Sequence, residues 1–435
     1  MLPHPLLTIA GLVLAAAPTA VPSATATAPT AFITPATNPT ATPTASVTPT
    51  DVATPTTTAT APPDLATVAS LSVPATVTVP GATTPIPWPT RGHAQLEVAG
   101  IGSLGRSGTT KSVPIASITK VMTAYLVLRD HPLTPGVNGP TIVVSRAEAD
   151  SYARRRAEGE SLVKVKAGER ITERKALQGM LIASGNNMAD ILARWDAGSV
   201  PAFVQKMNAN AALLGLTSTR FADPSGLSAR SRSTTADLLT LAPLAMADRT
   251  FAKIVSRTSA TIPLNKIKNT NTLLGRHGVI GIKTGTTRAA GGCLLFATRR
   301  TIAGHVVTIY GALLGAPGPT RHANALAASD DLIVAARKSL RATTLVPAGR
   351  DAATVTRSDG TVVHLVPTTN AVTLIGLAGE TYALALPAGL TPGQVPTTMT
   401  ARTATRTISI PLTPTPIAPP IPLPTGSPDP AGGSR

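Results

Sequence analysis

Three short groups of polar residues have the types and the spacing that nucleophilic catalysis needs. They are Ser117-Ile118-Thr119-Lys120, Ser184-Gly185-Asn186 and Lys283-Thr284-Gly285. A spacing of three residues places Ser117 and Lys120 one turn apart on the same face of a helix. A serine hydroxyl needs an adjacent base before it can attack a carbonyl carbon. Lys120 is the candidate base, provided that its amine spends time uncharged.

The Ser-x-x-Lys pattern is a weak signal by itself, because the chain holds a second copy at Ser161–Lys164. That copy lies in a polar, alternating stretch after three arginines, which is more typical of a surface strand than of a helix start. The first copy follows Pro114 and runs into an apolar segment with helical spacing. Ser117 is therefore expected at a helix N-terminus, where free N–H groups stabilise negative charge; the alternative is a simple N-cap.

The other two motifs are ordinary when each is taken alone. Ser184-Gly185-Asn186 is common turn chemistry, and a lysine at a strand end is usually solvated. When both occur with Ser-x-x-Lys in one domain and in this order, they are no longer ordinary and indicate a catalytic site. Ser-x-x-Lys, Ser-x-Asn and Lys-Thr-Gly elements occur together in penicillin-binding proteins and class A β-lactamases.

Around these motifs the chain resembles the serine-type D-alanyl-D-alanine carboxypeptidases, the low-molecular-weight penicillin-binding proteins. The segments that carry the resemblance are PIASITKVMTA (114–124), LIASGNN (181–187), FADPSGL (221–227) and GIKTGTTRAAGGC (281–293). The resemblance implies an enzyme that removes the terminal D-alanine from peptidoglycan stem peptides and is inhibited by β-lactams. Ser117 would carry the acyl group, and Lys120 would be the base because burial and the nearby charge of Lys283 disfavour its ammonium form.

The same resemblance implies roles for the remaining motif residues. Ser184 could relay a proton to the leaving amine, and Asn186 could bind the peptide backbone of the substrate. Lys283 and Thr284 are suited to hold the terminal carboxylate of the substrate.

The backbone beyond Thr284 completes the expected site. Gly285 would leave the strand edge open to the substrate, and the N–H groups of Ser117 and Thr286 would bind the oxyanion. We read Asp223 and Ser225, in the Asp-Pro-Ser-Gly-Leu segment, as a structural turn. No metal or other cofactor is expected, and Arg276 and His277 are left without a role.

Hydrophobic periodicity predicts the elements that must position these residues. The expected strands are 93–100, 279–283, 293–297 and 305–311, and the expected helices are 115–129, 173–183 (with Thr172 as N-cap) and 187–195. Together they indicate an α/β fold of the β-lactamase/transpeptidase type, an antiparallel sheet flanked by helices with a helical subdomain inserted between its strands.

Composition divides the chain into five expected parts. They are a signal peptide (1–26), a disordered Thr/Ala/Pro-rich stalk (27–90), a penicillin-binding DD-peptidase domain (91–340), a small β-rich accessory domain (345–410) and a disordered Pro-rich tail (411–435). The signal peptide implies export, to the cell wall or beyond it. In the accessory domain Ser358-Asp359-Gly360 is a hairpin turn signal.

Charge and aromatic content limit the classes of binding partner that we expect, and the single cysteine bears on the core. The net charge is +17, and all 38 Lys and Arg lie at or beyond residue 91. Such a domain attracts anions, so anionic wall polymers are possible partners. Nucleic acid is not expected, since aromatic residues make up only 3% of the chain and no nucleic-acid-binding signature is present. The single cysteine, Cys293, lies in an apolar run and is expected to be buried and structural.

Three other functions remain open. A β-lactamase of the same fold would need an efficient deacylating base, in class A a glutamate, and no glutamate lies between Ser184 and Lys283. A DD-endopeptidase acting on peptide crosslinks cannot be separated from a carboxypeptidase by sequence. A non-catalytic wall-binding protein would explain the stalk and the charge, but it leaves the three motifs as coincidence.

Overall fold

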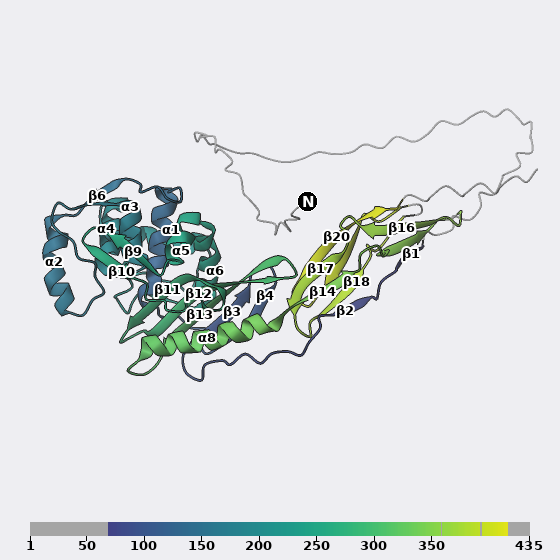
Figure 1. Ribbon diagram of the computed structural model, residues 1–435, viewed down its shortest axis with the longest axis horizontal. Coiled ribbons are helices and arrows are strands. Elements are labelled where there is room, and N and C mark those ends of the chain that lie inside the picture. The colour runs from purple at the N-terminus through teal and green to yellow at the C-terminus, as the bar shows by residue number, and fades with distance from the viewer. Residues whose placement is uncertain (1–67, 358, 392–393, 416–435) are drawn as a thin grey trace, which may run out of the picture. The chain divides into compact units, whose positions relative to one another are not determined.

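The computed structural model describes residues 68–357, 359–391 and 394–415 (Figure 1). The predicted signal peptide therefore lies outside the described residues, as does most of the predicted stalk. In the described parts of the chain, no helix combines the length and the hydropathy of a membrane-spanning segment.

A five-stranded antiparallel sheet forms the centre of the peptidase domain, in the order β11-β12-β13-β3-β4. Its strands are β3 (His93–Val98), β4 (Gly102–Ser107), β11 (Val279–Thr287), β12 (Gly291–Ile302) and β13 (His305–Ala316). The predicted strands are present, and the last three are longer than expected. Since β11 lies at one edge, only one side of its ladder is paired with a strand.

Helices cover both faces of this sheet. Along β12 the side chains of Cys293, Leu295 and Ala297 join one core and those of Leu294 and Phe296 another, as the alternation of a strand requires. The first core includes residues of α6 (Thr235–Ala247), and the second includes residues of α8 (Arg321–Ser339). Burial raises the pKa of the Cys293 thiol to about 12, as expected for a structural cysteine.

The remaining helices belong mainly to the inserted subdomain. They are η1 (Ala116–Thr119), α1 (Lys120–Asp130), α2 (Arg146–Ala157), α3 (Glu173–Leu181), α4 (Asn186–Ala197), α5 (Val200–Leu213), α7 (Arg249–Val255) and η2 (Arg276–Gly278). Short two-stranded ladders join them: β5 (Val113–Pro114) with β8 (Arg232–Ser233), β6 (Thr141–Val143) with β7 (Arg170–Thr172), and β9 (Ser259–Ile262) with β10 (Asn265–Lys268). The mixed α/β fold predicted from the sequence is confirmed.

The helix expected over 115–129 is divided in the structure. Residues 116–119 form a 3₁₀ turn, and the α-helix begins only at Lys120. The helix expected over 173–183 begins as predicted, because the Thr172 hydroxyl accepts a hydrogen bond from the backbone N–H of Lys175. Ser117 therefore lies in the tight turn that leads into α1 rather than in its first α-helical turn.

The C-terminal region is a β structure, as expected. Its strands are β14 (Leu340–Val346), β15 (Ala353–Thr356), β16 (Val362–Pro367), β17 (Val372–Leu377), β18 (Thr381–Ala385), β19 (Thr398–Arg402) and β20 (Thr407–Pro414). β15 and β16 pair across the predicted Asp-Gly turn, where the Asp359 carboxylate accepts a hydrogen bond from the backbone N–H of Thr361 at 2.8 Å.

Two predicted boundaries are wrong. β1 (Val68–Leu71) pairs with β15, and β2 (Thr76–Thr78) pairs with β18, so residues 68–78 belong to the C-terminal sheet and not to a stalk. β20 also continues into the predicted tail as far as Pro414. Threonine and valine favour strands, but prolines dominate the average composition of the surrounding segment. A prediction from average composition therefore missed these two strands.

Two valines test this corrected boundary. We expect Val79→Ala to lower the free energy of unfolding of the C-terminal region by about 2 kcal/mol. The Val79 side chain is buried in a core formed with residues of the C-terminal strands, and the substitution removes two methyl groups from it. Val68→Ala is the matched control, since Val68 is 61% exposed, and should cost less than about 0.5 kcal/mol. Calorimetric unfolding measures both; equal effects would contradict the assignment.

Candidate active site

The amine of Lys120 is the point where the first two sequence motifs meet. Its Nζ donates hydrogen bonds to Ser117 Oγ at 2.8 Å, to Asn186 Oδ1 at 2.8 Å and to the backbone carbonyl of Ser225 at 2.7 Å. An ammonium has three hydrogens, so these acceptors satisfy it completely. A neutral amine has two hydrogens and a lone pair, which leaves one position able to accept the hydrogen of the Ser117 hydroxyl.

The surroundings of Lys120 favour its neutral form. The side chain is completely buried, and burial followed by the charge of Lys283 holds its pKa well below its usual range. Three carboxylates, Asp223, Asp190 and Glu160, act in the opposite direction. Ser117 itself is only half-buried, so its hydroxyl links a buried base to the surface.

Lys283 brings the third motif into the same electrostatic environment. It lies on β11 with 1% of its surface exposed, and its Nζ donates to the carbonyl of Thr284 at 3.0 Å. Burial lowers the pKa of Lys283 to about 7. At neutral pH this group is therefore poised between its charged and neutral forms, and an anionic ligand beside it would favour the charged form.

Gly285 allows β11 to pass directly beside the nucleophile. A Cβ at Gly285 would lie 3.0 Å from the backbone nitrogen of Ser117 and 3.0 Å from the carbonyl oxygen of Ile115. The absent side chain thus permits close approach of strand and turn, in addition to the open edge expected from the sequence. Beyond it, the exposed Thr286 hydroxyl donates to the Gly285 carbonyl at 2.8 Å, and the buried Thr284 hydroxyl lies 2.5 Å from that of Thr270.

Two residues at the site have backbone conformations that L-residues rarely adopt. Ala116, immediately before the nucleophile, has φ of 46°, and Ser184 has φ of 61°. Such strain costs roughly 1–3 kcal/mol per residue and persists where the surrounding structure fixes it. Ser184 is buried beside Asn186, so the second motif is a constrained turn that directs its polar side chains inward.

Comparison with known proteins shows which protein family has these motifs. The family model for D-alanyl-D-alanine carboxypeptidase matches residues 104–311. The D-alanyl-D-alanine carboxypeptidase DacB2 of Mycobacterium tuberculosis is 36% identical over 215 residues, which cover 48% of this chain and 69% of that protein. The chain belongs to the D-alanyl-D-alanine carboxypeptidase family. It is therefore a serine hydrolase among the low-molecular-weight penicillin-binding proteins.

Two further similarities add to this membership. The D-alanyl-D-alanine endopeptidase of Pseudomonas aeruginosa is 35% identical over 195 residues, covering 43% of this chain and 59% of that protein. The structure of penicillin binding protein 5 from Haemophilus influenzae superposes with a TM-score of 0.57 at 23% identity, covering 77% of this chain and 98% of that one. The latter likeness concerns the fold alone.

The Asp-Pro-Ser-Gly-Leu turn contributes more to this family member's site than the sequence indicated. Its carboxylate, Asp223, accepts hydrogen bonds from two hydroxyls and four backbone N–H groups between residues 225 and 231. The turn thereby fixes the Ser225 carbonyl that Lys120 contacts. Gly226 is required there, because a Cβ would lie 1.8 Å from the carbonyl oxygen of Ala116.

A charged network behind Asn186 was missed by sequence reasoning. The Nδ2 of Asn186 donates to the Glu160 carboxylate at 2.8 Å, and Arg155 pairs with both Glu160 and Asp190 at 2.8 Å. The Glu160 side chain is only 5% exposed. This network orients the amide so that its oxygen faces Lys120.

The second Ser-x-x-Lys copy is neither a helix start nor the surface strand that we expected. Residues 160–166 form no regular element. The side-chain amide of Asn187 takes the place of a partner strand, bonding to the backbone N–H of Val163 at 3.0 Å and to its carbonyl at 2.7 Å. The Ser161 side chain is exposed, so this copy forms no second active site.

The two residues that were left without a role contact α8 and none of the motif residues described above. Arg276 and His277 form η2 and pair with Asp330 on α8, at 2.7 Å and 3.7 Å. Across the described ranges of the chain, no group of three or more His, Cys, Asp or Glu side chains is arranged to hold a metal ion.

The turn around Asp223 yields a stability prediction. Burial alone would raise the pKa of Asp223, but hydrogen bonds from Ser225, Ser228 and Ser231 overcome this effect and lower it. We expect Asp223→Ala to reduce the free energy of unfolding by about 3 kcal/mol at pH 7, since it leaves several buried donors without an acceptor.

The pH dependence of this loss has a defined sign. A lowered carboxyl pKa stabilises the fold above the unfolded-state pKa of about 3.9, and this contribution disappears as the pH falls through the lower folded-state value. The difference between the wild type and Asp223→Ala should therefore shrink at low pH in urea titrations followed by circular dichroism. Asp331→Ala, at an exposed position of α8, is the control. A constant difference would show that the carboxylate charge is irrelevant.

Proposed function

We propose that this serine hydrolase is a DD-carboxypeptidase that removes the terminal D-alanine from peptidoglycan stem peptides. Membership of the family supports the coarser statement, that the protein is a peptidoglycan DD-peptidase. The observation that carries the acyl-enzyme mechanism is the 2.8 Å hydrogen bond between Ser117 Oγ and the buried amine of Lys120. The finer proposal, a substrate with a free carboxylate, is supported by the buried Lys283. Such a substrate lies outside the cytoplasm, so we also propose that the protein is exported.

Acylation follows from this geometry. The Ser117 oxygen attacks the carbonyl carbon of the D-Ala-D-Ala bond while its proton moves to the neutral amine of Lys120. The oxyanion is held by the backbone N–H groups of Ser117 and Thr286. Collapse of the tetrahedral intermediate breaks the C–N bond, and the proton passes to the departing amine of D-alanine, with Ser184 as a relay. Water then hydrolyses the ester on Ser117.

Recognition of a free C-terminus depends on Lys283 and Thr284. A carboxylate beside Lys283 favours its ammonium form and forms a charge-assisted hydrogen bond with it. The positive charge of Lys283 that attracts the substrate carboxylate is also a charge that lowers the Lys120 pKa. Asn186 offers its remaining N–H to the peptide backbone.

Two alternatives are distinguished by substrate and by time course. The similarity to an endopeptidase keeps open a crosslink between two stem peptides as the substrate, and release of free D-alanine from a peptide ending in D-Ala-D-Ala separates this activity from a carboxypeptidase. A β-lactamase would hydrolyse its acyl-enzyme rapidly. Glu160, which accepts a hydrogen bond from Asn186, is also paired with Arg155, and this disfavours its use as a deacylating base. We therefore expect penicillin to label Ser117 persistently.

The two Ser-x-x-Lys copies provide a matched test of the nucleophile. Ser117→Ala should reduce D-alanine release from a D-Ala-D-Ala peptide by about a thousandfold or more and abolish covalent labelling by penicillin. Ser161→Ala removes the same atom from the second copy and should retain wild-type activity. Amino-acid detection and mass spectrometry of the labelled protein measure the two results. Labelling that survives Ser117→Ala would refute the assignment.

The charges around Lys120 predict the pH profile. The active form needs Lys120 neutral and Lys283 charged, so kcat/KM should rise with pH as Lys120 loses its proton and fall as the pH passes the Lys283 pKa of about 7. Lys283, Asp223, Asp190 and Glu160 are the charged groups that set the Lys120 pKa.

Removing one of these charges should shift only one limb of the profile. Glu160→Gln retains an acceptor for Asn186 but deletes a negative charge that raises the Lys120 pKa, so the rising limb should move to lower pH. Glu158→Gln, which removes an exposed carboxylate two residues away, should leave the limb in place. A rising limb that is unmoved in Glu160→Gln would contradict the role given to Lys120.

A further inference from the structure

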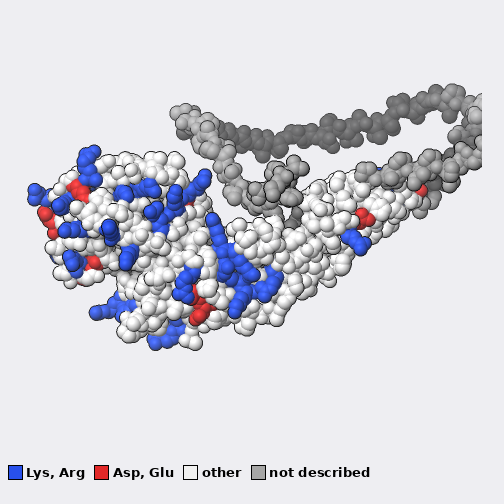
Figure 2. Space-filling model, in the orientation of Figure 1, with Lys and Arg blue, Asp and Glu red and all other residues white. Residues whose placement is uncertain are grey.

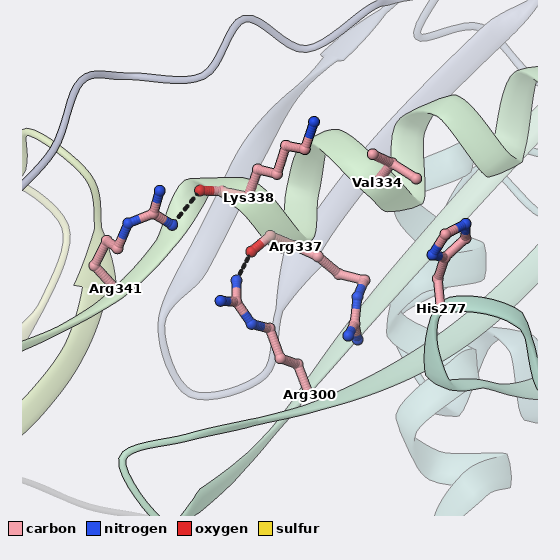
Figure 3. Close-up of a pocket in the computed structure, with 6 residues that line it drawn as sticks. All are labelled: His277, Arg300, Val334, Arg337, Lys338 and Arg341. Atoms are coloured by element: carbon pink, nitrogen blue, oxygen red, sulfur yellow. Dashed lines mark hydrogen bonds between the residues drawn. The ribbon is translucent and has the colours of Figure 1, made fainter.

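A basic pocket lies on the α8 side of the sheet, apart from the residues of the active site. Figure 3 shows its lining, which comes from η2, β12, α8 and the start of β14. The lining residues are His277, Arg300, Val334, Arg337, Lys338 and Arg341, and they enclose about 440 Å³. Figure 2 shows basic side chains gathered over the C-terminal end of α8 and the hairpin between β12 and β13.

The three guanidinium groups are held in place by backbone carbonyls. Arg300 donates to the carbonyl of Arg337 and, at 3.4 Å, to that of Leu340. The Nη1 of Arg337 donates to the Arg299 carbonyl at 2.6 Å, and the Nη1 of Arg341 donates to the Leu340 carbonyl at 2.9 Å. These bonds are made through a single nitrogen of each group, so the other N–H donors remain available in fixed orientations.

Carboxylates do not balance this charge. Throughout the described residues, Arg300, Arg337, Lys338 and Arg341 form no ion pair. The carboxylate of Asp330, on the same helix, is paired with Arg276 and lies 3.7 Å from His277. The last carbonyls of α8 attract cations, but a helix end carries only about half a negative charge. Burial, followed by the charge of Arg300, lowers the pKa of Arg337, as expected when cations gather without a counter-ion.

We propose that this pocket binds a ligand that carries two or more linked phosphate groups. Guanidinium forks match the geometry of phosphate oxygens. Arg337 and Lys338 lie in the last turn of α8, Arg341 follows at the start of β14, and Arg300 comes from β12, so the cations are supplied from several points around the pocket. A single carboxylate would neutralise only one of the four cations, whereas a diphosphate or a short phosphodiester chain neutralises several of them.

Titration of the full-length protein with pyrophosphate at low ionic strength tests this proposal. Isothermal calorimetry should show saturable binding that weakens with salt, and acetate at equal ionic strength should not compete. Lys338→Glu should weaken binding by about tenfold or more, because it reverses a charge of the pocket. The Lys338 side chain is exposed and has no hydrogen bond or ion pair with any other described residue, so the substitution breaks no contact of the fold. Lys266→Glu, an exposed position on β10, changes the net charge equally and should leave the affinity unchanged.

Three results would overturn the proposal. They are the absence of saturable pyrophosphate binding to the wild type, equal weakening by Lys338→Glu and Lys266→Glu, and binding to phosphatidylglycerol vesicles that Lys338→Glu abolishes while pyrophosphate does not bind. The last result would assign the surface to a membrane. Unchanged thermal unfolding of Lys338→Glu ensures that loss of binding reflects the pocket and not the fold. The test does not involve Ser117 and is independent of the proposed function.

Discussion

Two lysine amines share a buried space with too little solvent to stabilise both charges. Lys120 and Lys283 are each essentially inaccessible, and the charge of Lys283 is the second cause, after burial, of the low pKa of Lys120. A buried lysine ordinarily destabilises a protein. In the proposed mechanism both amines are used, because Lys120 acts as a base only when it is neutral and Lys283 attracts an anion only when it is charged.

The fold satisfies the requirement by bringing distant chain segments together at one edge of the sheet. β11 supplies Lys283 and, through the missing side chain of Gly285, approaches the backbone of Ser117. The turn around Asp223 supplies a carbonyl to Lys120, and α4 supplies Asn186. These contacts fix the amine on three sides and leave the serine oxygen partly open. The left-handed backbone at Ala116 and Ser184 shows that the turns carrying the two serines are held by their surroundings.

Patterns within short stretches of sequence predicted the features of the site that depend on residues close together in the chain. The spacing of Ser117 and Lys120, the strand that carries Lys283 and the N-cap at Thr172 follow from periodicity and residue chemistry. The chemical roles assigned to the motif residues remain predictions; these residues are Ser117, Lys120, Ser184, Asn186, Lys283, Thr284, Gly285 and Thr286. Glu160 and Arg155 could not have been recognised from the sequence, because their importance comes from contacts with α4 across an irregular loop. A charged residue in such a loop resembles a solvated one until the fold places it against a buried amide.

The error at the N-terminal boundary has a similar origin. Residues 68–78 have the composition of the preceding Thr/Ala/Pro-rich segment, but they find partner strands about 280 to 310 residues later in the chain. Pairing at such separation leaves no local signal beyond a modest strand preference. The basic pocket at the end of α8 is another feature that only the assembled structure reveals, since Arg300 is distant in sequence from Arg337 and Arg341.

The most direct measurement is the titration of the Lys120 amine itself. Lysine residues labelled with ¹⁵N can be followed by NMR as the pH is changed, with the Lys120 signal assigned by its loss in Lys120→Arg. We expect Lys120 Nζ to lose its proton well below the ordinary lysine pKa of about 10.4, and Lys283→Met to raise the Lys120 pKa toward that value. A Lys120 amine that stays protonated up to pH 10 in the wild type would contradict its role as the base.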